Sequence, residues 1–174
     1  VAQGSSAGVG SVLADAIARR AGRDRVALRF HPDGRISLHD SQPTGWQGAD
    51  YVVDMLPDVA FAIFGEGPEA AVFTRLVHSA GFRHRLVTPS QQTLDMVAAS
   101  GCRAQLWDST TPLALADVDA RTAVVTFFHD HGRELPILRA ALAGPAFYVG
   151  AQGSRQVAAR RRDALAALGV AAAD

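Results

Sequence analysis

Residues 59–70, Val-Ala-Phe-Ala-Ile-Phe-Gly-Glu-Gly-Pro-Glu-Ala, decide the fold of this chain. The run 59–64 is continuously apolar, which is typical of a strand buried on both faces of a parallel sheet. A glycine-rich turn follows the run, and apolar residues at helical spacing then predict a helix over about 69–80. The order strand, tight turn and helix predicts the opening unit of an α/β sheet.

The same alternation continues to the end of the chain. Strands are predicted at 84–88, 104–107, 122–128 and 146–149, and helices at 91–99, around Leu135, Leu138 and Leu142, and from about Ser154 onward. Strands that alternate with helices in this way predict an α/β fold, namely a Rossmann-like, doubly wound parallel sheet. In the last helix we expect Val157, Ala164, Leu165 and Leu168 to face inward and Arg160, Arg161 and Arg162 to face solvent.

The N-terminal third has a different pattern. A helix over 12–21 and two short strands at 26–30 and 35–38 predict a small α+β appendage. Glycine and proline gather in residues 41–48, which indicates a boundary, and the apolar stretch 51–56 is interpreted as a strand leading into the next unit. We therefore expect a reduced N-terminal segment at 1–48 and a Rossmann domain at 50–174.

Composition restricts the function. The 174 residues are 48% apolar and 20% charged with zero net charge, which is typical of a globular protein and argues against nucleic-acid binding. No apolar run is long enough to cross a bilayer, so we expect a cytoplasmic protein. The single cysteine, Cys102, excludes an intrachain disulfide and a cysteine-based zinc or iron–sulfur cluster built by this chain alone. Cys102 is interpreted as a small structural residue, and His78 and His84 as structural or surface residues.

The first chemical signal is the turn from Gly65 to Ala70, which fits the dinucleotide fingerprint G-x-G-x-x-A. In that fingerprint the glycines allow a tight turn and close approach to a pyrophosphate at a helix N-terminus. Three features oppose nucleotide binding. Glu66 and Glu69 are negative, Pro68 lacks an N–H, and no acidic residue follows the strand that ends at Thr88. The turn therefore either binds a nucleotide or is a Rossmann turn that no longer binds one.

Two further signals follow strand ends, where open α/β sheets bind ligands. His129, Asp130 and His131 come after the strand at 122–128, as a candidate anion site, metal site or proton donor, or as an ordinary polar loop. Residues 150–155, Gly-Ala-Gln-Gly-Ser-Arg, form a second glycine loop before the last helix. There Ser154 is expected to cap the helix and Arg155 to pair with an anionic group. The alternative is a pair of tight turns that serve only the fold.

These residues together resemble a known family. The stretches 122–131, 138–142 and 146–155 are similar in order and spacing to the Rossmann domain of XdhC/CoxI proteins, and 59–67 resembles the family's first strand and glycine loop. The resemblance covers about residues 50–170. It implies an accessory protein that binds molybdenum cofactor (molybdopterin) and aids its maturation or insertion into a molybdenum hydroxylase such as xanthine dehydrogenase. The cofactor-binding positions that it implies are Gly65, Gly67, His129, Asp130, Gly150, Gly153, Ser154 and Arg155.

The chain also departs from that family. Residues 1–48 contain no cysteine where members often have a Gly-Gly-Cys segment, Pro68 stands where a histidine is common, and the acidic residue after the second strand is missing. We expect a cofactor chaperone without catalytic or metal-ligating residues. The alternative is an NAD(P)-dependent oxidoreductase or another nucleotide-binding enzyme on the same fold. A homodimer is expected from apolar surface at Val52, Val53, Met55 and Leu56.

Overall fold

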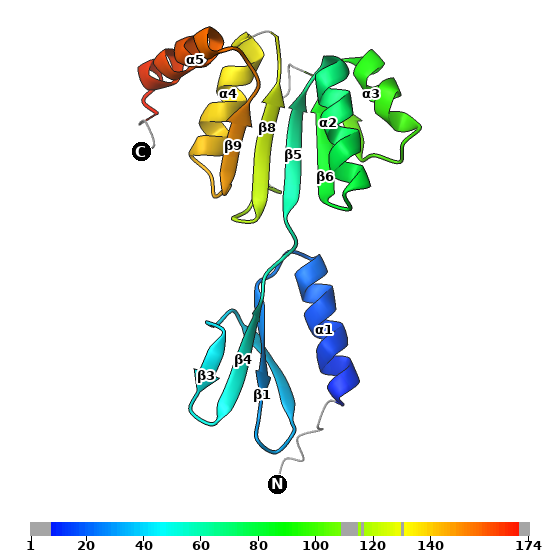
Figure 1. Cartoon of the computed structure of the whole chain (residues 1–174), viewed down its shortest axis with the longest axis vertical. Coiled ribbons are helices and arrows are strands. Elements are labelled where there is room, and N and C mark those ends of the chain that lie inside the picture. The colour runs from blue at the N-terminus through cyan, green and yellow to red at the C-terminus, as the bar shows by residue number, and fades with distance from the viewer. Residues whose placement is uncertain (1–7, 109–114, 116, 130, 171–174) are drawn as a thin grey trace. The chain divides into compact units, whose positions relative to one another are not determined.

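The computed structural model describes residues 8–108, 115, 117–129 and 131–170. The chain forms two compact units, Val1–Asp58 and Val59–Asp174, each with its own sheet (Figure 1). The division falls about ten residues after the expected boundary at 41–48. The reason is that the strand after that segment pairs with strands of the first unit instead of leading into the second.

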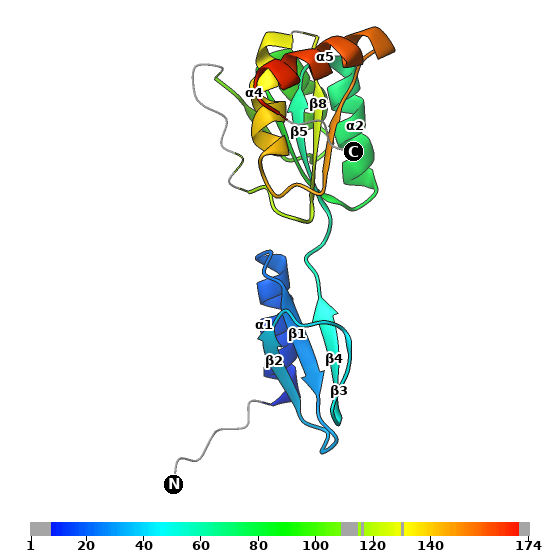
Figure 2. The same ribbon diagram turned by 90° about the vertical axis from the view of Figure 1, so that its left-hand side faces the viewer.

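The first unit is one helix on a four-stranded antiparallel sheet. Its elements are α1 (Val9–Ala21), β1 (Val26–Phe30), β2 (Ile36–Asp40), β3 (Gly45–Gln47) and β4 (Asp50–Met55), and the strand order is β2-β1-β4-β3. The helix α1 lies against β1 and β2 (Figure 2) and buries Ala16 against Val26 and Leu28. The strand β3 lies inside the segment expected to be a linker.

The apolar residues expected to form a dimer surface are covered within this unit. Val52 is completely buried in β4, and Val53, Met55 and Leu56 are only half-exposed. Met55 packs against the cluster around Val26. The four residues therefore do not form the exposed apolar surface from which the homodimer was predicted, and that prediction was wrong about this surface.

The second unit is a five-stranded parallel sheet with helices on both faces. Its strands are β5 (Ala60–Gly65), β6 (Arg83–Thr88), β7 (Ala104–Leu106), β8 (Thr122–Phe127) and β9 (Tyr148–Ala151). Its helices are α2 (Gly67–Ser79), α3 (Gln91–Ala98), α4 (His131–Leu142) and α5 (Arg155–Ala167). The order β7-β6-β5-β8-β9, with every pair parallel, confirms the Rossmann-like sheet predicted from the sequence.

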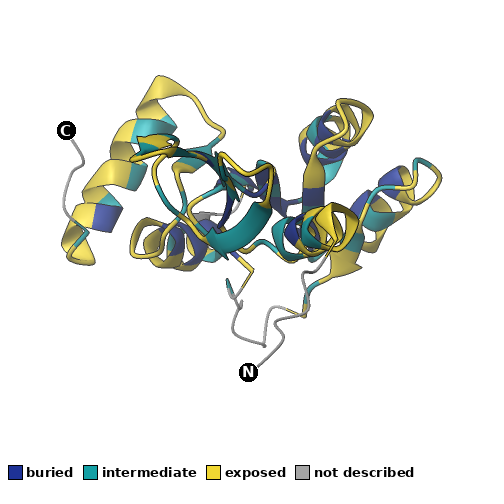
Figure 3. Cartoon of the chain, turned by 90° about the horizontal axis from the view of Figure 1, so that it is seen from below, coloured by how far each residue is buried: buried dark blue, intermediate teal, exposed yellow. Residues whose placement is uncertain are grey.

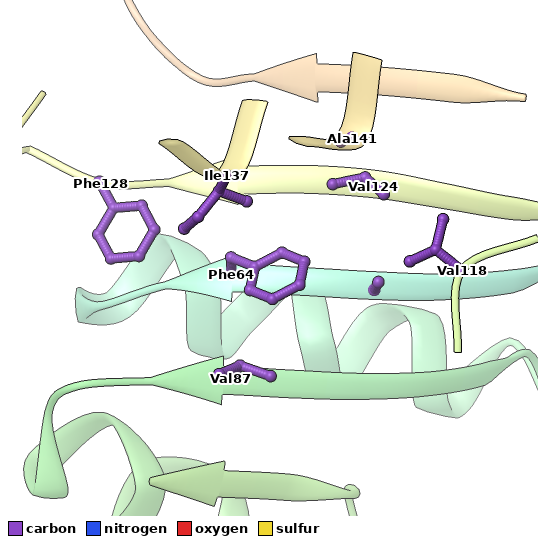
Figure 4. Packing of buried hydrophobic residues seen from close by; sticks show 8 residues of the cluster. Phe64, Val87, Val118, Val124, Phe128, Ile137 and Ala141 are labelled. Atoms are coloured by element: carbon purple, nitrogen blue, oxygen red, sulfur yellow. The ribbon is translucent and has the colours of Figure 1, made fainter. Parts of the chain in front are cut away.

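The continuous apolar run of β5 reflects burial on both faces of the sheet. Ile63 packs on the side of α2 and α3, against residues such as Ala70 and Val97. Its neighbour Phe64 points the other way, toward Ile137 of α4 (Figure 4). Figure 2 shows α2 and α4 on opposite sides of β5 and β8. Burial follows the same layers, with exposed residues on the outer faces of the helices (Figure 3).

The helix α5 departs from its expected orientation. Leu165 is buried as predicted, but Leu168 is 43% exposed. The side chain of Arg161, predicted to face solvent, is only 8% exposed, because it forms an ion pair with a buried carboxylate. Among the described residues, no helix is both long and apolar enough to span a membrane.

The strand order reverses between β5 and β8. From β5 the chain winds outward to β6 and β7, and it then returns to β8 and winds the other way to β9. In open α/β sheets, the crevice at the carboxyl ends of the strands beside such a reversal is where ligands bind. The loops after β5, β8 and β9 all lie at this edge, because the three strands are parallel.

Candidate functional site

Gly65 brings β5 and β8 together at the strand-order reversal. A Cβ atom at this position would lie 2.4 Å from the carbonyl oxygen of Phe127 and 2.7 Å from its Cβ, so no larger residue fits without a shift of β8. The N–H of Glu66 donates to the same carbonyl at 3.0 Å. Gly65 thus allows the backbones of β5 and β8 to approach each other closely.

The next glycine shapes the turn and uses its amide within the fold. Gly67 has a φ of +88°, in the left-handed region that favours glycine. Its N–H donates to Oγ1 of Thr93 at 2.8 Å, and Pro68 has no N–H to offer. With the amide of Glu66 also engaged, the amides at 66 and 67 are directed at protein oxygens instead of a pyrophosphate.

A hollow of about 240 Å³ opens beside this turn, at the carboxyl ends of β5 and β6. It is lined by Glu66, Gly67, Pro68, Ser90, Gln92, Thr93 and Met96. The carboxylate of Glu66 is 28% exposed, and Nη1 of Arg133 in α4 lies 3.8 Å from its Oε2. The lining of the hollow is therefore largely polar, and the carboxylate of Glu66 is paired with a cation of α4. Arg133 was not predicted as a site residue, since nothing in the local sequence distinguishes it from a solvated helix residue.

The loop after β8 places His129 at the same edge of the sheet. His129 is exposed and directly follows Phe128, which is 4% exposed and packs in the core. Asp130, the other residue predicted from this loop, lies outside the described residues. His129 is therefore accessible to a ligand, and the core position of its neighbour fixes where the loop leaves the sheet.

The loop after β9 reaches this edge beside the β8 loop, because β9 pairs with β8 and the N–H of Gln152 donates to the carbonyl of Thr126 at 3.0 Å. Gly150 lies under the ring of Tyr148, and a Cβ there would stand 2.6 Å from a ring atom. A Cβ on Gly153 would stand 2.9 Å from Cγ1 of Val157. Both glycines therefore permit close packing.

The start of α5 follows this loop. Ser154 caps the helix as predicted, because its hydroxyl accepts the N–H of Val157 at 3.3 Å. Arg155 is exposed and makes no ion pair or hydrogen bond with another described residue. A cation and a helix N-terminus thus meet at an exposed point of the carboxyl edge, an arrangement that suits an anion.

Arg161 and Glu134 fix the backbone of this loop, and neither role was predicted from the sequence. Glu134 is completely buried, and it accepts from Oγ1 of Thr126 at 2.6 Å and from Nε of Arg161 at 2.8 Å. Arg161 also donates to the carbonyls of Ala151 and Gln152, at 3.4 and 2.8 Å. One guanidinium therefore neutralises a buried carboxylate and fixes the backbone of the β9–α5 loop.

The parallel sheet, its flanking helices and the strand-order reversal define a Rossmann-like domain. The family model of the XdhC Rossmann domain matches residues 61–174, about two thirds of the chain. The chain therefore belongs to the XdhC family.

Two comparisons accompany this assignment. The molybdenum cofactor insertion chaperone PaoD of Escherichia coli (strain K12) is 32% identical over 149 residues, which cover 84% of this chain and 41% of PaoD. A crystal structure of a xanthine dehydrogenase from Bacillus halodurans superimposes with a TM-score of 0.61 at 13% identity, covering 88% of this chain and 52% of that one. The second similarity concerns the fold. The chain spans about two fifths of PaoD and about half of the solved chain.

Proposed function

We propose that this chain binds molybdenum cofactor as cargo and aids its maturation or insertion into a hydroxylase of the xanthine dehydrogenase type. Membership of the XdhC family supports the proposal. So does the similarity to PaoD, a molybdenum cofactor insertion chaperone, although the chain matches only 41% of its length. We propose a non-catalytic role for the chain, in the cytoplasm.

The observation that carries the proposal is the mixed chemistry of the carboxyl edge. A pterin presents a ring N–H and an amino group side by side. Glu66 lines the hollow, and its carboxylate, which remains 28% exposed beside Arg133, can accept hydrogen bonds from such a pair. The phosphate of the cofactor needs donors and positive charge, which Arg155 and the N-terminus of α5 supply. The negative charge of Glu66, which opposes a pyrophosphate, is thus suited to the pterin end of the cofactor.

Within the proposal, the predicted site residues have different roles. Arg155 and Ser154 contact the anionic end, and His129 borders it. Gly67 lines the hollow with its amide bound to Thr93, and Gly65 keeps β5 close to β8. Gly150 and Gly153 allow the β9–α5 loop its tight path.

The alternative, an NAD(P)-dependent enzyme, has less support. The amides of Glu66 and Gly67 are engaged with protein oxygens, Pro68 has none, and Ser90 at the end of β6 offers no carboxylate for a ribose. The backbone at positions 66 to 68 therefore offers a pyrophosphate no free N–H.

Titration of the purified chain distinguishes the two proposed functions. Calorimetry measures the binding of molybdenum cofactor and, in parallel, of NAD⁺ and NADPH. We expect saturable micromolar binding of molybdenum cofactor and none of either nicotinamide nucleotide. Tight nucleotide binding without cofactor binding would reverse the proposal. Co-purification with a molybdenum hydroxylase subunit tests the proposed partner separately.

We also propose a homodimer, on a different surface from the one first expected. Phe30, Tyr51 and Trp46 are cross-strand neighbours in β1, β4 and β3, and together we call them the aromatic row. Trp46 is 74% exposed, and its ring meets that of Tyr51 at a centroid distance of 5.2 Å. An exposed row of large rings is typical of a surface that another protein covers.

A further inference from the structure

Three potential metal ligands meet at the amino edge of the parallel sheet. His78 lies in the last turn of α2, His84 is the second residue of β6, and Cys102 comes two residues before β7. One ligand atom from each lies within 4.8 Å of the others. A single cysteine excludes a zinc site made of cysteines, but not one in which two histidines join it. The sequence does not show that they meet, because 18 positions separate His84 from Cys102.

Both ring nitrogens of His84 contact backbone groups, and these contacts fix the orientation of the ring. Its Nδ1 lies 3.0 Å from the carbonyl oxygen of Phe82, so Nδ1 carries the proton and donates. Its Nε2 then has the lone pair, which accepts the N–H of Arg103 at 3.2 Å. A backbone carbonyl on one nitrogen is the usual way in which a protein orients a histidine that binds metal through the other.

His78 and Cys102 complete the arrangement from the other two elements. The rings of His78 and His84 meet edge to face at a centroid distance of 5.2 Å. Nε2 of His78 lies 3.7 Å from where a Cβ on Gly101 would stand, directly before Cys102. Gly101 has a φ of +70°, so the turn that presents Cys102 is one that favours glycine.

We propose that His78, His84 and Cys102 bind a zinc ion through two imidazole nitrogens and one thiolate, with water as the fourth ligand. Imidazole and thiolate are the ligands that Zn²⁺ prefers, and bonds of about 2.0–2.3 Å place tetrahedral ligand atoms roughly 3.3–3.6 Å apart. The side chain of His78 is exposed and can rotate to close the remaining distance. Binding transfers the thiol proton to solvent and replaces the hydrogen bond from Arg103 to Nε2.

The site joins three elements and is separate from the proposed cofactor site. It would tie the end of α2 and the start of β6 to the turn before β7. The glycine loops lie at the opposite, carboxyl edge of the same sheet. The inference therefore does not depend on the proposed function, and either can fail without the other.

Cobalt(II), a spectroscopic substitute for zinc, tests the ligand set in the reduced full chain. We expect a sulfur-to-cobalt charge-transfer band and tetrahedral d–d bands that saturate at one equivalent and disappear when zinc is added. Cys102→Ser should lose the charge-transfer band, and His78→Ala should lose saturable binding at the same concentrations. His39→Ala, which removes an imidazole from the first unit, is the matched control and should bind as the unaltered chain does.

Thermal unfolding gives a second measurement, the change in Tm when zinc is added. Residues with a purely structural role would not produce this change. Zinc should raise the Tm of the unaltered chain and of His39→Ala, and should leave the Tm of Cys102→Ser and His78→Ala unchanged. Both test positions are exposed or half-exposed, so these variants avoid the buried His84. The proposal is overturned if the unaltered chain shows no charge-transfer band, or if His78→Ala binds cobalt as tightly as the unaltered chain.

Discussion

Arg161 donates from Nε to Oε2 of Glu134 at 2.8 Å, and the two side chains are only 8% and 0% exposed. The pair joins α5 to α4, and Thr126 extends it to β8. Because Arg161 also binds the carbonyls of the β9–α5 loop, the position of Arg155 depends on a charge that is hidden from solvent. A buried pair of this kind is costly to break from one side, since the remaining charge loses its partner.

Replacing Arg161 with alanine should strongly destabilise the second unit. The change leaves Glu134 buried without its cation, and breaking such a pair costs about 3–5 kcal/mol. Urea unfolding, followed by circular dichroism, measures the loss in the free energy of unfolding.

The matched control is Arg162→Ala, one residue further along α5. Arg162 is exposed, so its loss should change the free energy of unfolding by no more than about 0.5 kcal/mol. Equal stabilities of the two variants would contradict the importance given to the buried pair.

Gly65→Ala should also destabilise the chain, because its new Cβ would stand 2.4 Å from the carbonyl oxygen of Phe127. Forcing extra volume into a packed position costs about 1–3 kcal/mol. Gly10→Ala in α1 is the counterpart, since its Cβ meets nothing within 4 Å and a helix favours alanine. In chemical denaturation, the denaturant concentration at the midpoint of unfolding should be lower for Gly65→Ala than for the unaltered chain. For Gly10→Ala it should be unchanged or higher.

Arg155→Ala should weaken the binding of molybdenum cofactor, because it removes a charge-assisted contact to the anionic end. Hydrogen bonds to charged groups contribute about 1.5–3 kcal/mol, or roughly ten- to a hundredfold in Kd. Arg162→Ala should bind as the unaltered chain does, and both variants should keep their stability. Similar losses of affinity in the two variants, measured by calorimetry, would show that the anion site lies elsewhere.

The thiol of Cys102 should ionise at higher pH in the folded chain than in the unfolded one. Burial raises its pKa, and the charge of Arg75 lowers it by a smaller amount. Between the two pKa values the folded state holds more protons than the unfolded state. The free energy of unfolding is therefore largest below the unfolded pKa and falls as pH rises through the folded pKa. Iodoacetamide alkylation across pH, in metal-free native and urea-unfolded protein, measures both midpoints. A native midpoint at or below the unfolded one would refute the effect of burial.

The aromatic row should mediate a dimer at micromolar concentration. Trp46→Ser removes its most exposed ring and should shift the chain toward monomer without unfolding it, because Trp46 is 74% exposed. Light scattering over a dilution series measures both forms. A monomeric unaltered chain at the highest concentration would remove the proposed homodimer.

The sequence by itself determined the elements of the second unit. Strands buried on two faces need unbroken apolar runs, so 59–64 and 122–128 were predicted to within one or two residues of β5 and β8. The helix start at Ser154 was also predictable, since a cap contacts an amide only three residues away. Each of these features depends on residues that are close together in the chain, so the sequence alone is enough to predict it.

Tertiary structure alone decided the rest, because it depends on partners far apart in sequence. Arg161 looks like a solvated helix residue until Glu134, 27 positions earlier, is brought beneath it. The sequence pattern predicts that the amide of Gly67 faces a phosphate, whereas in the structure it donates to Oγ1 of Thr93. A local pattern records periodicity and turn chemistry, whereas the burial of a charge or the use of an amide depends on which distant segment packs against it.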